Sequence, residues 1–351
     1  MGIKYTTETL NRLVQPHAMS RSVLQGALND DYKFTGVKTV EIVTAVSQPI
    51  GDYKREGANR YGEPQELQDT TQELTLSQDK SWAMTIDQGN FKDQKFLKKT
   101  QEAIKMQQRE QVVPFYDRYA LNVFAHRAGT IVGATADLEK TNICDRIMDA
   151  GAYLDDAEVP AEGRTLFISA KGFKTLKLSD EFVKVEKLAY KSITTGLMGE
   201  FDGMRVVKVP KSRWPQDVNF MIVHKASATA PKKIHEVNCH SNPPGISGTL
   251  IEGRDYFDAF VIGVRAAGVY AEIKKGVTVL AAPTIAATTG AITVASGATA
   301  KYTTDGSDPR YSATAVIGAA PADVKAGMTV KAYAFKEGAY DSPVTEVTIT
   351  G

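Results

Sequence analysis

The sequence predicts an α+β protein that ends in a small all-β sandwich, and three observations carry this prediction. One helix with a single apolar stripe is unusually long, and short, irregularly spaced strands follow it. That irregular spacing does not fit the regular alternation of a doubly wound sheet. From residue 277 onwards the chain is rich in Ala, Thr and Gly and lacks His, Cys and Trp. We therefore divide the chain into an α+β body and an appended β domain.

Composition and charge fit an ordinary soluble globular protein. The 351 residues are enough for two or three domains, and the 42 basic residues nearly balance the 41 acidic ones. That balance argues against a dedicated nucleic-acid binder. Cys144 and Cys239 make no disulfide framework, so a reduced compartment is the simpler interpretation. The sequence shows neither a signal peptide nor a run of about 18 apolar residues, so we expect a cytosolic origin and no membrane contact.

The first ninety residues are predicted to form an arm followed by a long hairpin. Residues 1–35 are polar and poorly periodic, with a short helical signal near their end. A β-rich run begins at Val37, and a second alternating run continues through Trp82 to Asp87. We interpret residues 36–90 as one two-stranded excursion. Because an isolated hairpin is marginally stable in water, it is expected to lie on a neighbouring subunit.

A long helix is predicted to begin near Asn90, a suitable N-cap, and to end before Gly129. Its stripe covers about 37 residues, or ~55 Å at the rise of an α-helix. Pro114 should kink the helix, since proline lacks a backbone donor. A second helix is expected over residues 138–155, with Tyr153 and Leu154 on its buried side.

The rest of the body is predicted to be rich in short strands. They are expected at residues 165–169, 206–209, 220–223 and within 256–273, with a helix or turn over 172–178. In the appended domain, strands are expected at residues 292–295, 300–303, 329–335 and 344–350. Asp-Gly, Ala-Gly and Glu-Gly turns separate them, a pattern typical of a small sandwich.

The appended domain resembles a known family. The run from Lys301 to Pro309, followed by residues 330–334, is similar to the immunoglobulin-like domain appended to chitobiases and related hydrolases. The resemblance implies the fold of residues 277–351 and gives only weak information about a ligand.

The body resembles the major capsid proteins of tailed phages, of the Hong Kong 97 type. The resemblance is carried by the order of the elements and by local patterns at residues 164–176, 199–210, 221–226, 230–234 and 253–259. It implies an N-terminal arm (1–35), an extended hairpin loop (36–90), a spine helix with peripheral domain (91–160), an axial domain (161–255), a return to the peripheral domain (256–275) and an immunoglobulin-like surface domain (277–351).

The function that this resemblance implies is structural. The chain would assemble into hexamers and pentamers of an icosahedral head around double-stranded DNA, with the β domain facing outwards. It would be located in the virion after assembly in the host cytoplasm. The expected partners are further copies of the chain, a separate scaffolding protein, a portal protein, packaged DNA through non-specific contact, and a host-surface glycan through residues 277–351. No enzymatic activity, cofactor or metal is expected.

Two groups of site residues follow from this interpretation. Residues expected in contacts between subunits lie in the hairpin region: Lys54, Arg55, Arg60, Glu63, Glu66, Glu73, Leu74, Leu76, Trp82 and Met84. Residues that would face DNA lie on the long helix: Lys95, Lys98, Lys99, Lys105 and Arg109. The alternative for the second group is a solvated helix face.

Other clusters favour plainer interpretations. His235, Cys239 and His240 lack a fourth ligand at zinc spacing. Asp305, Asp308 and Asp341 could collect calcium, but an Asp-Gly turn that satisfies its own backbone is the stronger interpretation. The alternative function is a carbohydrate-active enzyme or a glycan-binding surface protein. A retaining hydrolase needs two carboxylates about 5–5.5 Å apart, and no acidic pair in the sequence suits that role.

Overall fold

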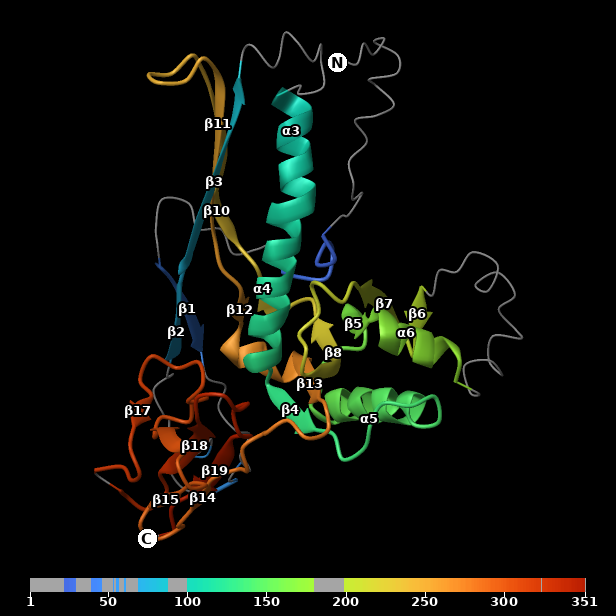
Figure 1. Cartoon of the computed structure of the whole chain (residues 1–351). Helices are drawn as coiled ribbons and strands as arrows, with labels where there is room; N and C mark the ends of the chain where they lie inside the picture. The colour runs from blue at the N-terminus through green and yellow to red at the C-terminus, as the bar shows by residue number, and fades with distance from the viewer. Residues whose placement is uncertain are drawn as a thin grey trace. The chain divides into compact units, whose positions relative to one another are not determined.

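The computed structural model describes residues 22–29, 39–45, 53, 55–56, 60, 69–87, 100–179, 199–322 and 324–350. The chain forms two compact units (Figure 1). The first comprises Met1–Gly36, Leu76–Val261 and Arg265–Val277, and the second comprises Val37–Thr75, Ile262–Val264 and Thr278–Gly351. The hairpin region and the C-terminal domain therefore share one unit.

A sheet of long antiparallel strands in the order β10-β11-β3 forms one part of the first unit. Its strands are β3 (Gln78–Asp87), β10 (Lys232–Ser241) and β11 (Gly248–Phe257). The register places Trp82 opposite Gly253 and Met84 opposite Ile251. A Cβ at Gly253 would lie 2.2 Å from the Trp82 ring, so only glycine fits beneath the indole there.

This pairing corrects the predicted extent of the hairpin. The sequence predicts one two-stranded excursion over residues 36–90, but its last strand, β3, pairs with β11 instead. The period-two alternation correctly predicts a strand. The partner lies about 170 residues further along the chain, and local alternation carries no information about it.

A long helix runs beside this sheet (Figure 1). It consists of α3 (Thr100–Gln107), a π-helical segment η1 (Gln108–Val112) and α4 (Val113–His126). The N–H of Val113 bonds the carbonyl of Gln108, five residues back, directly before Pro114. The wider π-helical turn therefore lies directly before Pro114, which has no backbone N–H to donate. The predicted helix is confirmed over these residues, and its predicted start near Asn90 lies outside the described residues.

The second part of the first unit is a mixed sheet in the order β4-β13-β8-β5-β7-β6 (Figure 1). Its strands are β4 (Thr130–Gly133), β5 (Arg164–Ser169), β6 (Glu200–Phe201), β7 (Met204–Val209), β8 (Val218–His224) and β13 (Val269–Ile273). Helices α5 (Ile143–Asp156) and α6 (Ala170–Lys177) share one apolar cluster with it. The small elements β9 (Ala228–Thr229) and β12 (Phe260–Val261) also belong to the first unit, and the 3-10 helix η2 (Gly263–Gly268) has residues in both units.

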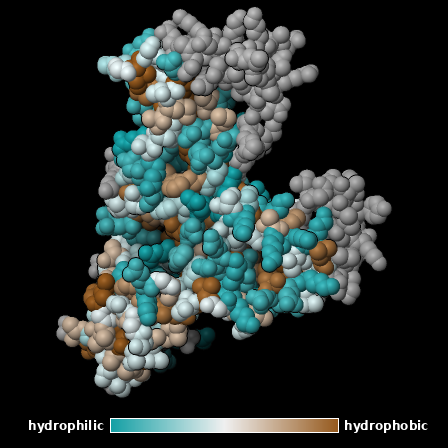
Figure 2. All heavy atoms as spheres, in the orientation of Figure 1, coloured by the Kyte–Doolittle hydropathy of each residue, from teal (hydrophilic) through white to brown (hydrophobic). Residues whose placement is uncertain are grey.

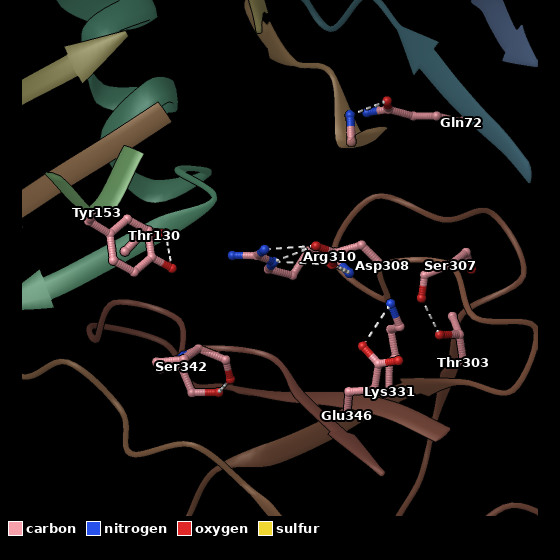
Figure 3. Close-up of polar contacts among 12 residues, drawn as sticks. Gln72, Thr130, Tyr153, Thr303, Ser307, Asp308, Arg310, Lys331, Ser342 and Glu346 are labelled. Atoms are coloured by element: carbon pink, nitrogen blue, oxygen red, sulfur yellow. Dashed lines mark hydrogen bonds and ion pairs between the residues drawn. The ribbon is translucent and has the colours of Figure 1, made fainter. Parts of the chain in front are cut away.

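Two sequence-based predictions for this part need correction. Strand pairing puts β10 and β11 with β3, so the predicted block of residues 161–255 is divided between two sheets. Tyr153 was expected on the buried side of α5, but its side chain is 47% exposed. Its hydroxyl accepts a hydrogen bond from Thr130 Oγ1 at 3.1 Å (Figure 3), so the aromatic ring lies at the sheet margin.

The second unit contains a two-stranded hairpin and a small β sandwich. The hairpin is formed by β1 (Thr39–Ala45) and β2 (Asp69–Thr75). The sandwich consists of β14 (Thr284–Ile285), β15 (Ile292–Thr293), β16 (Thr299–Thr303), β17 (Val316–Ile317), β18 (Thr329–Phe335) and β19 (Thr345–Thr348). The positions of β15, β16, β18 and β19 confirm the four predicted strands, whereas β14 and β17 were not predicted. Gly306, Gly327 and Gly338 have φ of +78°, +84° and +77°, as the predicted glycine turns require.

Candidate assembly surface

The hairpin has two chemically different faces. In the antiparallel register Val40 lies opposite Leu74, and Leu74 is only 1% exposed. On the other face Glu41 lies directly opposite Glu73, and both are exposed. Like charges in directly opposite positions destabilise a ribbon. Among the described residues, no cation forms an ion pair with either carboxylate.

The predicted hairpin contacts fall into three groups. Arg55, Arg60 and Glu73 are exposed, as contacts with another subunit require. Leu74 and Leu76 are buried within the chain itself, and Trp82 and Met84 are half-buried on β3. Lys54, Glu63 and Glu66 lie outside the described residues. The predicted contacts thus include exposed polar residues, whereas the two buried leucines offer no free surface.

The residues predicted to face DNA are described only in part. Lys105 on α3 and Arg109 on η1 are exposed. Lys95, Lys98 and Lys99 lie outside the described residues. Figure 2 shows hydrophilic side chains over much of the visible face of the first unit, with hydrophobic ones in separate spots.

A buried carboxylate fixes the N-terminal segment to the long helix. Asp117 on α4 is fully buried and forms an ion pair with Arg213 Nη1 at 2.7 Å. Its two oxygens also accept hydrogen bonds from Ser22 Oγ at 2.6 Å and from the Val23 amide at 3.1 Å. A buried charge is tolerated only with such full compensation. Asp117 therefore joins three segments that are distant in the sequence.

Residues 22–29 are folded onto their own chain, although the sequence predicts an extended arm there. The Asn29 amide donates to the Ala228 carbonyl at 2.9 Å, and Thr229 Oγ1 donates to the Asn29 carbonyl. Leu24, Ala27 and Leu28 are buried. The polar composition of this segment predicted an extended arm. The residues that satisfy its polar groups, such as Asp117 and Ala228, lie more than ninety residues away, so the local sequence did not indicate them.

A second buried carboxylate, Asp258, fixes the point where the chain enters β3. The Ser77 amide donates to its Oδ2 and the Tyr119 hydroxyl donates to its Oδ1, both at 2.7 Å. Burial, together with this hydrogen bond, raises the pKa of Tyr119 to about 12. The neighbouring Phe257 ring is contacted edge-on by the rings of Phe115, Tyr116 and Tyr119. The base of β3 is therefore rigidly tied to the long helix.

A third buried carboxylate joins α5 to the mixed sheet. Glu272 on β13 accepts two hydrogen bonds from Arg146, at 2.5 and 2.9 Å, and one from Asn219 at 2.9 Å. Burial raises the pKa of this carboxyl even though these donors oppose the shift.

Sequence reasoning did not select these anchors, although one signal was present. Asp117 stands on the buried side of α4 together with Ala120, Leu121 and Phe124. A carboxylate on an apolar stripe must be neutralised, which marks it as an anchor. Asp258 and Glu272 gave no comparable signal, because their partners are set by tertiary packing.

The remaining polar clusters are already paired. His235 Nδ1 lies 2.5 Å from Asp255, and His240 lies 3.4 Å from Glu252. Asp305 Oδ1 accepts the Ser307 amide at 3.0 Å, which confirms the predicted Asp-Gly turn. In the part of the chain that the structure describes, no group of three or more His, Cys, Asp or Glu could hold a metal ion. No helix in that part is long and apolar enough to span a bilayer.

The fold is that of phage capsid proteins. The chain is similar to one from Mycobacterium phage Che8, with 18% identity and a TM-score of 0.61, over 74% of this chain and 93% of that one. It is similar to the capsid of Cyanophage P-SCSP1u, with 10% identity and a TM-score of 0.61, over 78% and 92%. For the mature capsid of bacteriophage PhiM1 the values are 13% identity, a TM-score of 0.59, and 75% and 90%.

The C-terminal domain has a separate relationship. Residues 275–346 match the family model of the chitobiase/beta-hexosaminidase C-terminal domain. No curated protein matches the sequence. The chain thus combines a capsid fold with a chitobiase-type C-terminal domain, and both predicted resemblances are confirmed at the level of fold.

Proposed function

We propose that this chain is a major capsid subunit that assembles into the hexamers and pentamers of an icosahedral phage head. The observation that carries the proposal is the similarity in fold to the P-SCSP1u capsid, which extends over 92% of that chain. The similarity spans nearly the whole capsid subunit and is not limited to one shared motif.

The hairpin supports a role in a lattice of identical subunits. A two-stranded ribbon is marginally stable alone, and its Glu41–Glu73 face lacks a described cation. A basic side chain from a neighbouring copy would relieve the repulsion and set the register of the contact. Repeated around a closed symmetric shell, such contacts would give assembly its specificity.

The other proposed partners follow from the same role. The shell would enclose double-stranded DNA, with Lys105 and Arg109 making contacts that do not depend on base sequence. A separate scaffolding protein and a portal protein would guide assembly in the host cytoplasm. We propose no catalytic activity for the chain.

The C-terminal domain is proposed to face outwards, since a folded domain inside would compete with DNA for volume. Its match to a chitobiase-type domain is the observation that favours a host-surface glycan as ligand. The rings of Tyr302, Tyr333 and Tyr340 are buried in the domain, so these three cannot stack on a sugar. Tyr311 and Phe335 are half-buried and are the other aromatic residues of the domain.

Assembly can be tested by expressing the full chain with and without a candidate scaffolding protein. Gradient sedimentation and negative-stain microscopy should show closed shells, or capsomers that close when scaffold is added. Glu73→Lys should reduce particle yield, whereas Glu337→Lys, in an exposed turn of the C-terminal domain, should not. A chain that remains a compact monomer with and without scaffold would contradict the proposal.

A further inference from the structure

The hairpin and the C-terminal domain meet at a defined junction. The Gly263 amide donates to Gln72 Oε1 on β2 at 2.8 Å (Figure 3). One residue earlier on the same strand, the Thr71 carbonyl accepts the Ala313 amide at 3.4 Å. Three segments of the second unit thus converge there: the middle of strand β2, residues 262–264, and the loop before β17.

The loop from Asp305 to Thr314 is held in shape by its own hydrogen bonds. Asp305 accepts the Ser307 amide through one oxygen and Thr314 Oγ1, at 2.6 Å, through the other. Arg310 forms a 2.7 Å ion pair with Asp308 (Figure 3), and its guanidinium lies 5.2 Å from the Tyr311 ring. The loop therefore presents Tyr311 and Ala313 as a pre-shaped surface, with little conformational entropy left to lose.

Gly263 and Tyr311 pack closely against each other at this junction. A Cβ built on Gly263 would lie 2.7 Å from the Cβ of Tyr311, a distance that real side chains do not reach. Glycine at this position thus lets the 262–264 segment approach the loop closely enough for its amide to reach Gln72 at the same time.

We propose that the C-terminal domain is an intramolecular brace for the hairpin, in addition to any role on the particle surface. The Asp305–Thr314 loop and Gly263 together hold β2 at its middle, through Thr71 and Gln72. A bare two-stranded ribbon would sample many orientations, and the brace selects one before any partner binds. This inference goes beyond capsid assembly and holds for the unassembled subunit.

Hydrogen exchange of the full-length, unassembled chain tests the brace. Gln72→Ala removes the acceptor, and Glu73→Ala is a matched control on the same strand with its side chain on the opposite face. Gln72→Ala should accelerate exchange about fivefold both in β1–β2 and at the Ala313 amide, the effect of losing one hydrogen bond. Glu73→Ala should leave the Ala313 amide unchanged.

Gly263→Ala attacks the junction from the other side, and Gly199→Ala is its control because nothing lies within 4 Å of a Cβ there. Only Gly263→Ala should accelerate exchange in the hairpin. If Gln72→Ala does not fold, the Gly263→Ala result tests the brace by itself. The brace is refuted if the Gly263 and Ala313 amides exchange at unprotected rates in the natural chain. It is equally refuted if a junction variant changes exchange on only one side of the junction.

Discussion

The body of the first unit and the hairpin of the second unit place their carboxylates in opposite environments. Asp117, Asp258 and Glu272 are buried, and each is surrounded by donors from distant segments. Glu41 and Glu73 are exposed and face each other across the ribbon. The body uses carboxylates to complete its own fold, whereas the hairpin keeps its Glu41–Glu73 pair exposed. Stability and assembly should therefore respond to different substitutions.

The largest effect is expected at Asp117. Asp117→Ala leaves the Arg213 guanidinium buried without its partner and should lower the free energy of unfolding by about 3–5 kcal/mol. Chemical denaturation followed by circular dichroism measures this change. Asp156→Ala, at the exposed end of α5, is the control and should have little effect. If the two variants prove equally stable, the anchoring role of Asp117 is wrong.

A smaller loss is expected where Trp82 covers Gly253. Gly253→Ala puts a methyl group into the indole and should destabilise the three-stranded sheet by about 1–3 kcal/mol. Tryptophan fluorescence in urea reports this, since the ring must move. An unchanged spectrum and midpoint would show that the ring does not lie over the glycine.

Removing one charge of the Glu41–Glu73 pair should have opposite effects on the stability of the free chain and on the yield of assembled particles. Glu73→Gln removes repulsion with Glu41 and should stabilise the free chain by about 0.2–1 kcal/mol. If the proposed contact exists, the same variant should form fewer particles, because a basic side chain of the neighbouring copy would lose its partner. Thermal melting and particle yield are measured together, with Glu337→Gln as control. Loss of stability in the free chain would mean that Glu73 already has a favourable partner there.

The smallest expected effect is a loss of hydrogen bonding at acidic pH in the Asp305–Thr314 loop of the C-terminal domain. Although burial opposes it, hydrogen bonds from Ser307 and Thr314 lower the pKa of Asp305 below its ordinary 3.8. The stabilisation is therefore present above about pH 4 and is lost as the pH falls through the lower, folded-state pKa. The protection factor of the Ser307 amide, which is its exchange rate relative to the intrinsic rate at the same pH, should fall in that range and should stay constant with pH in Asp305→Asn. A fall in protection that persists in the variant would assign the titration to another group.

The sequence was sufficient for features whose cause is local. The apolar stripe identified the long helix, the Asp-Gly and Ala-Gly pairs identified turns around Gly306 and Gly327, and alternation identified the strands of the C-terminal domain. In each of these cases the signal and the structure lie within the same few residues, so periodicity and backbone preference decide the outcome.

Only the tertiary structure decided the features that join distant segments. The alternation of apolar and polar residues correctly predicted that Trp82 lies in a strand. It did not predict that this strand, β3, pairs with β11 and is not part of the hairpin. Asp117 stood visibly on an apolar face, yet nothing local indicated Ser22 or Arg213 as its partners. Local pattern fixes which backbone conformation a segment prefers and which face is apolar. Which segments become partners depends on how the whole chain buries its charges and pairs its strands. A short stretch of sequence does not contain that information.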